Sequence, residues 1–196
     1  MDNERTLALF ALADKVRQSA KEAICSLKEL GIESIMITGD AEAVAKTVAE
    51  DLGIKRYHAR VLPQDKAKLV RDLKQKGQTA FTGDGINDAP ALLEADLGIA
   101  IGAGTDVAIE SADLVLIDDD PKDVVAALLL SKASYSKMTQ NLWWATAYNA
   151  VALPLAMGAL AWAGFVLSPA VGAVFMSLST IIVAINAVTL RRIRLT

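Results

Sequence analysis

The last 56 residues of the chain, Asn141 to Thr196, contain no acidic side chain, and this absence constrains the fold more than any other feature. Within them, 142–163 and 169–190 are two runs of 22 residues without a charge. An α-helix rises about 1.5 Å per residue, so each run is roughly 33 Å long, enough to cross the hydrocarbon core of a membrane. A buried hairpin of a soluble protein is the alternative. We therefore predict a transmembrane hairpin over 141–196, with spans at about 142–163 and 169–190.

Positive charges flank both ends of this predicted hairpin. Lys132 and Lys137 precede the first run, and three arginines follow the second, at 191, 192 and 194. Because cytoplasmic flanks are enriched in Lys and Arg, we expect both ends to lie in the cytoplasm. Trp143 and Trp144 are typical of an aromatic belt at the inner interface. The sequence thus predicts a multi-pass protein of the cell membrane, with lipid as a partner and both termini cytoplasmic.

The first 140 residues differ in character from the hairpin. They hold 17 basic and 23 acidic residues, a net charge of −6. This acidic balance argues against a protein that binds nucleic acid. The single cysteine, Cys25, excludes a disulfide scaffold, and the single histidine, His58, excludes a zinc site built from histidines. We expect a soluble domain over 1–140.

Short apolar runs alternate with stretches of helical spacing in this domain. The expected strands are 34–38, 56–60, 78–82, 97–101 and 113–117. The expected helices are 19–30, 41–52, 63–77, 89–95, 105–111 and 121–137. Such alternation predicts an α/β fold with a parallel, doubly wound sheet. Ligands bind such sheets at the carboxyl ends of the strands, so polar residues there are the candidate site.

The first candidate loop is Thr38-Gly39-Asp40, directly after the strand expected at 34–38. A Thr hydroxyl beside free backbone N–H groups at the start of a helix suits a phosphate oxygen. The alternative is structural, because Asp40 could simply cap the following helix. The three residues alone leave both interpretations open.

The second candidate loop follows the strand expected at 78–82. Asp84, Asn87 and Asp88 supply hard oxygen ligands, which suit Mg²⁺ bound together with phosphate and water. Gly83 and Gly85 would let a cofactor approach the backbone closely. Asp88 could also cap the helix that Pro90 helps to start. This loop predicts a magnesium site.

A lysine lies between these two loops in the sequence. Lys66 falls in the first turn of the helix that Pro63 opens, from which it could reach the strand ends and neutralise a phosphoryl group. The alternative is that Lys66 and Lys68 are ordinary solvated surface charges.

Polar residues within the two uncharged runs have two possible roles, because each is costly in lipid. They could form hydrogen bonds between helices, or they could line a path for a soft metal, since thioether suits Cu(I). Sequence chemistry alone leaves both open for these residues, which are Tyr148, Asn149, Met176, Ser177, Ser179, Thr180 and Asn186.

The three soluble motifs occur in the order TGD, P-x-x-K and GDGxNDAPAL. This series resembles the phosphorylation domain of P-type ATPases, and the resemblance implies a haloacid-dehalogenase-like (Rossmann-like) fold, incomplete here. It also implies that Asp84 binds Mg²⁺ with support from Asn87 and Asp88. By the same resemblance, the loop from Thr38 to Asp40 binds phosphate, and Lys66 contacts the phosphorylated carboxylate.

The hairpin carries Y-N-x4-P followed by M-S-x-S-T-x-x-V-x-x-N-A. This pattern resembles the last two helices of heavy-metal P-type ATPases, most of all the copper branch. The resemblance implies that copper is the transported ion and that it is bound by Tyr148, Asn149, Met176, Ser177 and Ser179. Ser179-Thr180 resembles the copper subgroup whose preceding membrane helix carries Cys-Pro-His, which leaves Cu(I) and Cu(II) both open.

One part of the family pattern is absent from these 196 residues, namely the DKTGT motif whose Asp is phosphorylated. We therefore expect the C-terminal portion of an ATP-driven copper transporter, with ATP bound by a nucleotide-binding domain that the chain lacks. Alone, it should form no phosphoenzyme and transport no metal. The alternative is a non-catalytic membrane protein or split-gene remnant that complements or regulates another ATPase chain. A magnesium-dependent phosphatase is disfavoured, since its nucleophile would come from the same missing motif.

Overall fold

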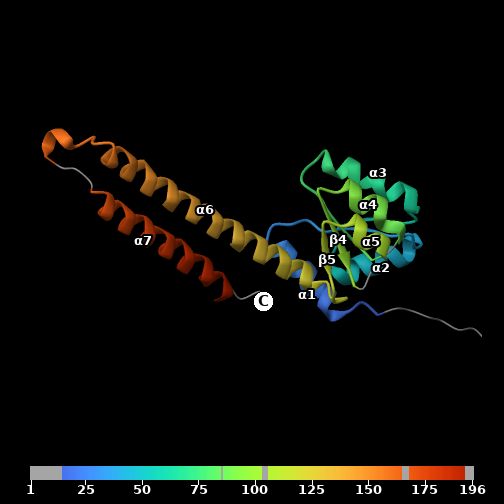
Figure 1. Cartoon of the computed structure of the whole chain (residues 1–196). Coiled ribbons are helices and arrows are strands. Elements are labelled where there is room, and N and C mark those ends of the chain that lie inside the picture. Colours follow the sequence, from blue (N-terminus) through green and yellow to red (C-terminus); the bar gives the residue numbers. More distant parts are fainter. Residues whose placement is uncertain (1–14, 85, 103–105, 165–167, 193–196) are drawn as a thin grey trace, which may run out of the picture. The chain divides into compact units, whose positions relative to one another are not determined.

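The computed structural model describes residues 15–84, 86–102, 106–164 and 168–192 (Figure 1). Two compact units divide the chain after Val125. Helix α6, Lys122–Ala156, begins in the first unit and continues through the second. The domain boundary expected at 140–141 therefore falls inside one continuous helix.

The first unit alternates helices and strands, close to the expected pattern. Its helices are α1 (Gln18–Glu29), α2 (Glu42–Leu52), α3 (Pro63–Lys74), the 3-10 turn η1 (Ile86–Asp88), α4 (Ala89–Glu94) and α5 (Asp106–Ser111). Its strands are β1 (Ile35–Ile37), β2 (Arg56–His58), β3 (Ala80–Gly83), β4 (Leu97–Ile101) and β5 (Leu114–Leu116). Apart from η1, which the sequence did not predict, each element coincides with an expected run to within one residue at its start or end or is shorter than that run. Most strands are shorter than expected.

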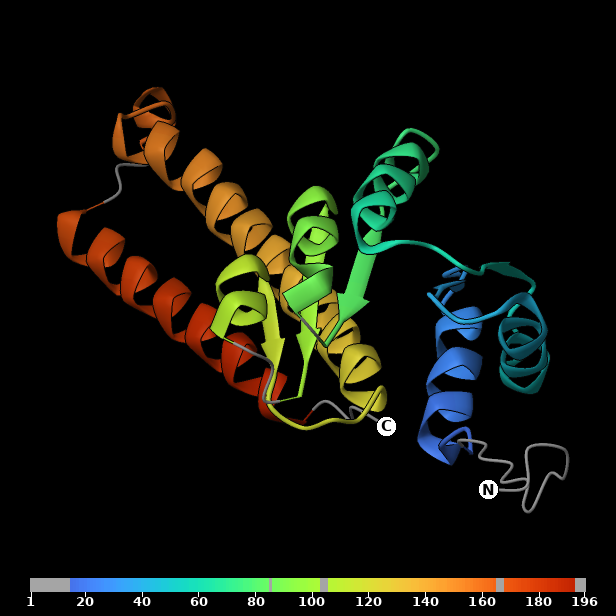
Figure 2. The ribbon, with the colours of Figure 1, turned by 90° about the vertical axis from the view of Figure 1, so that its right-hand side faces the viewer.

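All strand pairs in the described residues are parallel, which confirms the predicted α/β class. The strands form two sheets, however. β1 pairs with β2, while β3, β4 and β5 lie side by side in a second sheet (Figure 2). Among the described residues, every strand except β4 is therefore paired along one edge only, β1 and β3 included.

The core of this unit lies between α3, α4 and β4. Val70 of α3, Leu92 of α4 and Ile99 of β4 are its largest fully buried side chains. Burying a side chain of this size stabilises the fold by about 1.5–3 kcal/mol. This packing fixes the first turn of α3 next to the carboxyl end of β3, where the candidate site lies.

The second unit contains most of α6, then the 3-10 turn η2 (Ala161–Ala163), α7 (Pro169–Val188) and the 3-10 turn η3 (Thr189–Arg192). The helix expected at 121–137 does not stop there, because no Gly or Pro interrupts 132–141, and it merges with the first expected span. α6 ends earlier than that span, at Ala156. Gly158 adopts φ +85°, its N–H donates to Leu155 O, and the N–H of Ala159 donates to Pro154 O. This is the Schellman arrangement that ends helices.

Within the first expected span, the α-helix thus covers 142–156, roughly 22 Å at the rise of an α-helix, and the short 3-10 turn η2 follows it. Among the described residues, one helix is long and apolar enough to cross a membrane, Ala170–Arg191. Figure 1 shows α6 and α7 side by side, and hydrogen bonds join them.

The contact between these two helices follows a regular spacing. In both helices, half-buried residues recur every three, four or seven positions, and most residues between them are exposed. We name this contact the α6–α7 seam and define it by these residues: Lys137, Asn141, Ala145 and Tyr148 of α6, and Gly172, Ser179, Val183 and Asn186 of α7.

Candidate functional site

Lys66 and Asp88 form an ion pair at the carboxyl end of β3. Lys66 Nζ donates to Asp88 Oδ1 at 2.6 Å, and the two side chains are only 17% and 11% exposed. Leaving either charge in this position without its partner would be costly. Lys66 is therefore held at the strand end by its ion pair and is not an ordinary solvated surface lysine.

Gly83 makes room for this pair. A Cβ at Gly83 would lie 2.7 Å from Asp88 Oδ2 and 2.8 Å from Asp88 Cβ, closer than any side chain tolerates. The sequence suggested that Gly83 lets a cofactor approach; in the structure the group beside it is the Asp88 carboxylate. Asp88 also stands at the N-cap position of α4, but its side chain makes no capping hydrogen bond and bonds to Lys66 instead.

The donor set suits a divalent cation that prefers oxygen. Asp84 follows β3 directly and is exposed, as is Asn87, while Asp88 Oδ2 remains beside Gly83. Two carboxylates with an amide match the few protein ligands that Mg²⁺ uses when phosphate and water complete its shell. The described residues contain no cluster of three or more His, Cys, Asp or Glu that could hold a metal by itself. The expected Gly85 lies outside the described residues.

The loop from Thr38 to Asp40 follows β1 and is closed by its own hydrogen bonds. Thr38 Oγ1 donates to Asp40 Oδ2 at 2.7 Å, and the Asp40 N–H donates to Thr38 Oγ1 at 3.1 Å. The N-cap residue of α2 is Ala41, so Asp40 does not cap that helix. The loop is tied to the segment before α3, where Arg60, at φ +54°, donates its N–H to Asp40 O.

A second layer of contacts holds α3 against α4, and sequence patterns gave no signal for it. Arg71 makes a two-pronged ion pair with Glu94, at 3.0 and 2.8 Å, and Lys74 Nζ donates to Glu94 O at 2.7 Å. The hydrogen bond from Arg71 holds the pKa of the Glu94 carboxyl below its ordinary value. Arg71 is exposed, whereas Lys74 and Glu94 are half-buried, and together they link α4 to the helix that carries Lys66.

The proposed copper residues divide between two faces of the helix pair. Tyr148 and Ser179 lie on the α6–α7 seam, where Tyr148 OH donates to Gly172 O at 3.4 Å. Asn149, Ser177 and Met176 are exposed, Met176 to 66%. Ser177 Oγ bonds to Ala173 O within its own helix. The structure thus brings two of the five residues to one contact and leaves three facing away from it.

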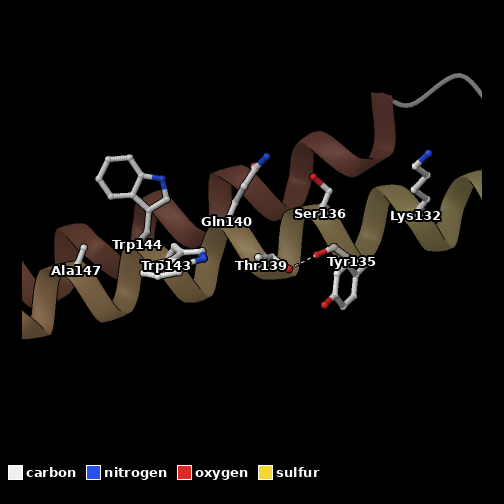
Figure 3. A pocket seen from close by; sticks show the side chains of 8 residues that line it. All are labelled: Lys132, Tyr135, Ser136, Thr139, Gln140, Trp143, Trp144 and Ala147. Atoms are coloured by element: carbon white, nitrogen blue, oxygen red, sulfur yellow. Dashed lines mark hydrogen bonds between the residues drawn. The ribbon is translucent and has the colours of Figure 1, made fainter.

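A shallow groove of about 680 Å³ runs along α6 (Figure 3). Tyr135, Trp143 and Trp144, which line it, are 61–70% exposed. Its remaining lining residues also come from α6: Lys132, Ser136, Thr139, Gln140 and Ala147. Cationic and hydroxyl groups lie at one end and indoles toward the other, the distribution typical of a helix at a membrane interface.

Comparison with known proteins places these features in a family. Residues 2–96 match the family model described as haloacid dehalogenase-like hydrolase. Over 97% of its length the chain is 59% identical to the copper-exporting P-type ATPase B of Archaeoglobus fulgidus. It is 52% identical over 96% of its length to the copper-exporting P-type ATPase B of Enterococcus hirae.

Solved structures agree with this assignment. A zinc-transporting PIB-type ATPase in its E2·Pi state matches 90% of the chain, with a TM-score of 0.79 and 34% identity, over 28% of its own length. The catalytic domain of the CPx-ATPase CopB-B matches 55% of the chain, with a TM-score of 0.51 and 35% identity, over 43% of that domain.

The fold is that of a haloacid-dehalogenase-like domain, followed in the chain by a pair of helices of which one is long and apolar enough to cross a membrane. The chain belongs to the copper-type P-type ATPases. It spans 28% of the length of the Archaeoglobus relative and 26% of the Enterococcus relative.

Proposed function

We propose that this chain is the part of an ATP-driven copper transporter that completes the phosphorylation site and carries part of the metal path. The observation that supports this most directly is the Lys66–Asp88 ion pair beneath Gly83, beside an exposed Asp84. It joins a cation, a buried carboxylate and an accessible carboxylate at one strand end. Phosphoryl transfer needs this combination of positioning and charge neutralisation.

Each residue of the site has a defined role in this proposal. Lys66 neutralises charge on the phosphoryl oxygens, and Asp88 holds Lys66 in place. The hydroxyl of Thr38 and the N–H groups of its loop would donate hydrogen bonds to a phosphate oxygen. Asp84, with Asn87 and Asp88, would hold Mg²⁺, which when bound neutralises phosphate charge. ATP is the phosphoryl donor, bound by a domain outside these residues.

The carboxylate that receives the phosphoryl group is supplied from outside these residues, and the split sheet suggests where it enters. From β1 the chain moves outward to β2, whereas from β3 it moves outward to β4 and β5. Such a reversal of direction is the topological switch point where ligands bind. A parallel strand paired with both β1 and β3 would join the two sheets. Its carboxyl end would meet the loops that carry Thr38 and Asp84.

Complementation tests this proposal. The chain is mixed, in lipid vesicles, with the remaining segment of a related copper ATPase that contains DKTGT, and labelled with [γ-³²P]ATP. We expect an acid-stable phosphoenzyme on that segment only when both parts are present, and its loss with Asp84→Asn. Lys68→Met is the control, because Lys68 is exposed on α3, the helix that also carries Lys66. Copper-stimulated, vanadate-sensitive ATPase activity of the chain alone would contradict the proposal.

The membrane part extends the proposal to transport. The apolar α7, the exposed indoles of α6 and the flanking cations support a hairpin in the cell membrane with both termini in the cytoplasm. Tyr148, Asn149, Met176, Ser177 and Ser179 would contribute oxygen and thioether groups to the copper path. Because Asn149, Met176 and Ser177 face away from the α6–α7 seam, we infer that another membrane helix completes the site.

A non-catalytic partner of another ATPase chain is the second candidate, favoured by the absence of DKTGT from the sequence. The same complementation experiment distinguishes the two. If the chain stimulates or inhibits an intact copper ATPase equally well with and without Asp84→Asn, its role is regulatory. If its effect requires Asp84, it supplies part of the active site.

A further inference from the structure

Asn186 lies at the centre of a polar network between α6 and α7. Its Oδ1 accepts a hydrogen bond from Lys137 Nζ at 2.8 Å, and its Nδ2 donates to Asn141 Oδ1 at 2.8 Å. Gln140 Oε1 lies at a longer distance of 3.4 Å from the same Nδ2. The backbone carbonyl oxygen of Asn186 accepts a hydrogen bond from Thr189 Oγ1 at 2.6 Å. One amide therefore bonds to two successive turns of the neighbouring helix through both of its ends.

This network favours a single register of the two helices. Apolar contacts alone specify register weakly in a membrane, because lipid chains are as apolar as the side chains they replace. A slide by one helical turn, about 5.4 Å, would leave both ends of the Asn186 amide and the Lys137 ammonium without these partners. A single buried Asn is known to fix register between packed helices in the same way.

The register set at this end carries over to the proposed metal residues. Gly172, Ser179 and Asn186 are spaced seven residues apart, so they lie on one face of α7. Asn141 and Tyr148 are also seven apart, on the face of α6 that meets it. Along this face of α7, Ser179 therefore lies between the contact of Asn186 with Asn141 and the contact of Gly172 with Tyr148.

We propose that Lys137, Asn141 and Asn186, here named the amide clamp, are positioning residues that set the register of α6 against α7. By doing so they hold Tyr148 and Ser179 at the spacing that the transported metal requires. The clamp residues are not themselves ligands. The part of this inference that concerns the metal rests on the proposed function above, whereas the part that concerns register does not.

The register is tested in the full chain in lipid nanodiscs, with Cys25→Ser as background. Spin labels at Val151→Cys and Val174→Cys report the distance between the helices, and both positions are exposed, at 62% and 66%. We expect one narrow distance in the parent. Asn186→Leu and Lys137→Met should broaden it or shift it by up to one turn, about 5 Å. Asn186→Asp should keep the narrow distance of the parent, since the new carboxylate can accept the hydrogen bond from Lys137 Nζ. An unchanged distance in Asn186→Leu would overturn the proposal.

The matched control is Thr180→Val. Thr180 is also a polar residue of α7, but its hydroxyl donates to Met176 O within the same helix and crosses no contact. We expect this variant to leave the distance unchanged. A shift equal to that of Asn186→Leu would mean that loss of any hydroxyl or amide perturbs the pair, and would also overturn the proposal.

Copper titration separates failure of the clamp from failure of the transporter assignment. If Met176→Ala binds copper as tightly as the parent, the proposed copper site is contradicted. The spin-label distances would still test whether the amide clamp sets the register. If the parent binds copper through Met176, Asn186→Leu should weaken affinity about tenfold, as removal of a supporting hydrogen bond does, and Asn186→Asp should recover it. X-ray absorption should show lost oxygen scatterers with the Cu–S contribution retained. A shifted distance with unchanged affinity would overturn the link to the metal.

Discussion

Asp88 and Gly83 illustrate how the site depends on single residues. The Asp88 carboxylate is 11% exposed and bonds to Lys66, and it occupies the space that a side chain at position 83 would need. A glycine in this motif could have served a positive φ or a ligand. Here it serves the close approach of a neighbouring side chain.

Gly83→Ala should therefore displace Asp88 and weaken its ion pair with Lys66. We expect a loss of about 1–3 kcal/mol in the free energy of unfolding, the usual cost of overpacking, together with weaker phosphoenzyme formation in the complemented protein. Denaturant unfolding monitored by circular dichroism measures the first effect. Gly77→Ala is the control, because a Cβ there meets nothing within 4 Å and the change should be neutral or slightly stabilising. Equal stability of the two variants would show that Asp88 can move freely.

At the scale of elements, exposed ion pairs attach helices to the first unit. Glu22 of α1 pairs with Lys122 at the start of α6, and Arg71 of α3 pairs with Glu94 of α4. Asp96, after α4, accepts a hydrogen bond from the Thr79 N–H at 2.9 Å. These bonds hold the pKa of all three carboxyls below their ordinary values.

A pH dependence follows from the direction of these shifts. A carboxyl whose pKa is lower in the folded state stabilises the fold above its unfolded pKa and loses that contribution as pH falls through the folded value. We expect constant thermal stability from pH 7 to about pH 5, and then a decline below the ordinary values of 4.5 for Glu and 3.8 for Asp. Melting temperatures across this range measure it. Glu22→Gln combined with Glu94→Gln should flatten the decline, and an identical curve would contradict this origin.

At the scale of the whole molecule, two sheets take the place of the single sheet that the pattern suggests. β1 and β3 each have one edge without a strand partner among the described residues. Unpaired edges expose N–H and C=O groups that a further strand can use. A strand that joined both would place its last residue at the loops that carry Thr38 and Asp84.

Amide hydrogen exchange tests whether a further strand pairs with the free edges of β1 and β3. Amides of β1 and β3 should exchange faster in the chain alone than after complementation with the DKTGT segment, because a new strand would bond to both free edges. β4 is the internal control, since it is paired on both sides already and should change little. Uniform slowing across all strands would indicate general stabilisation and not strand insertion.

Much of the first unit could be predicted from its sequence, for a local reason. The run at 97–101 is apolar, and β4 forms over the whole of it. The run at 56–60 is mostly polar, and β2 forms over its first three residues only. The end of α6 was misjudged because an apolar run does not show where a helix stops. Gly158, at φ +85°, ends it inside that run. The sequence also left undecided whether Asp40 and Asp88 cap helices. In the structure, the Asp40 side chain accepts a hydrogen bond from Thr38, and the Asp88 side chain accepts one from Lys66.

The sequence by itself determined the family and the parallel α/β class and supplied the candidate residues of the proposed site, because motifs and periodicity are local properties of the chain. Tertiary structure alone decided which of these residues meet. Lys66 is bound by Asp88 because burial of Val70 and Leu92 packs α3 on α4, and Met176 faces away from Tyr148 because the α6–α7 seam fixes the rotation of both helices. Such pairings depend on packing between distant segments, which no local pattern encodes.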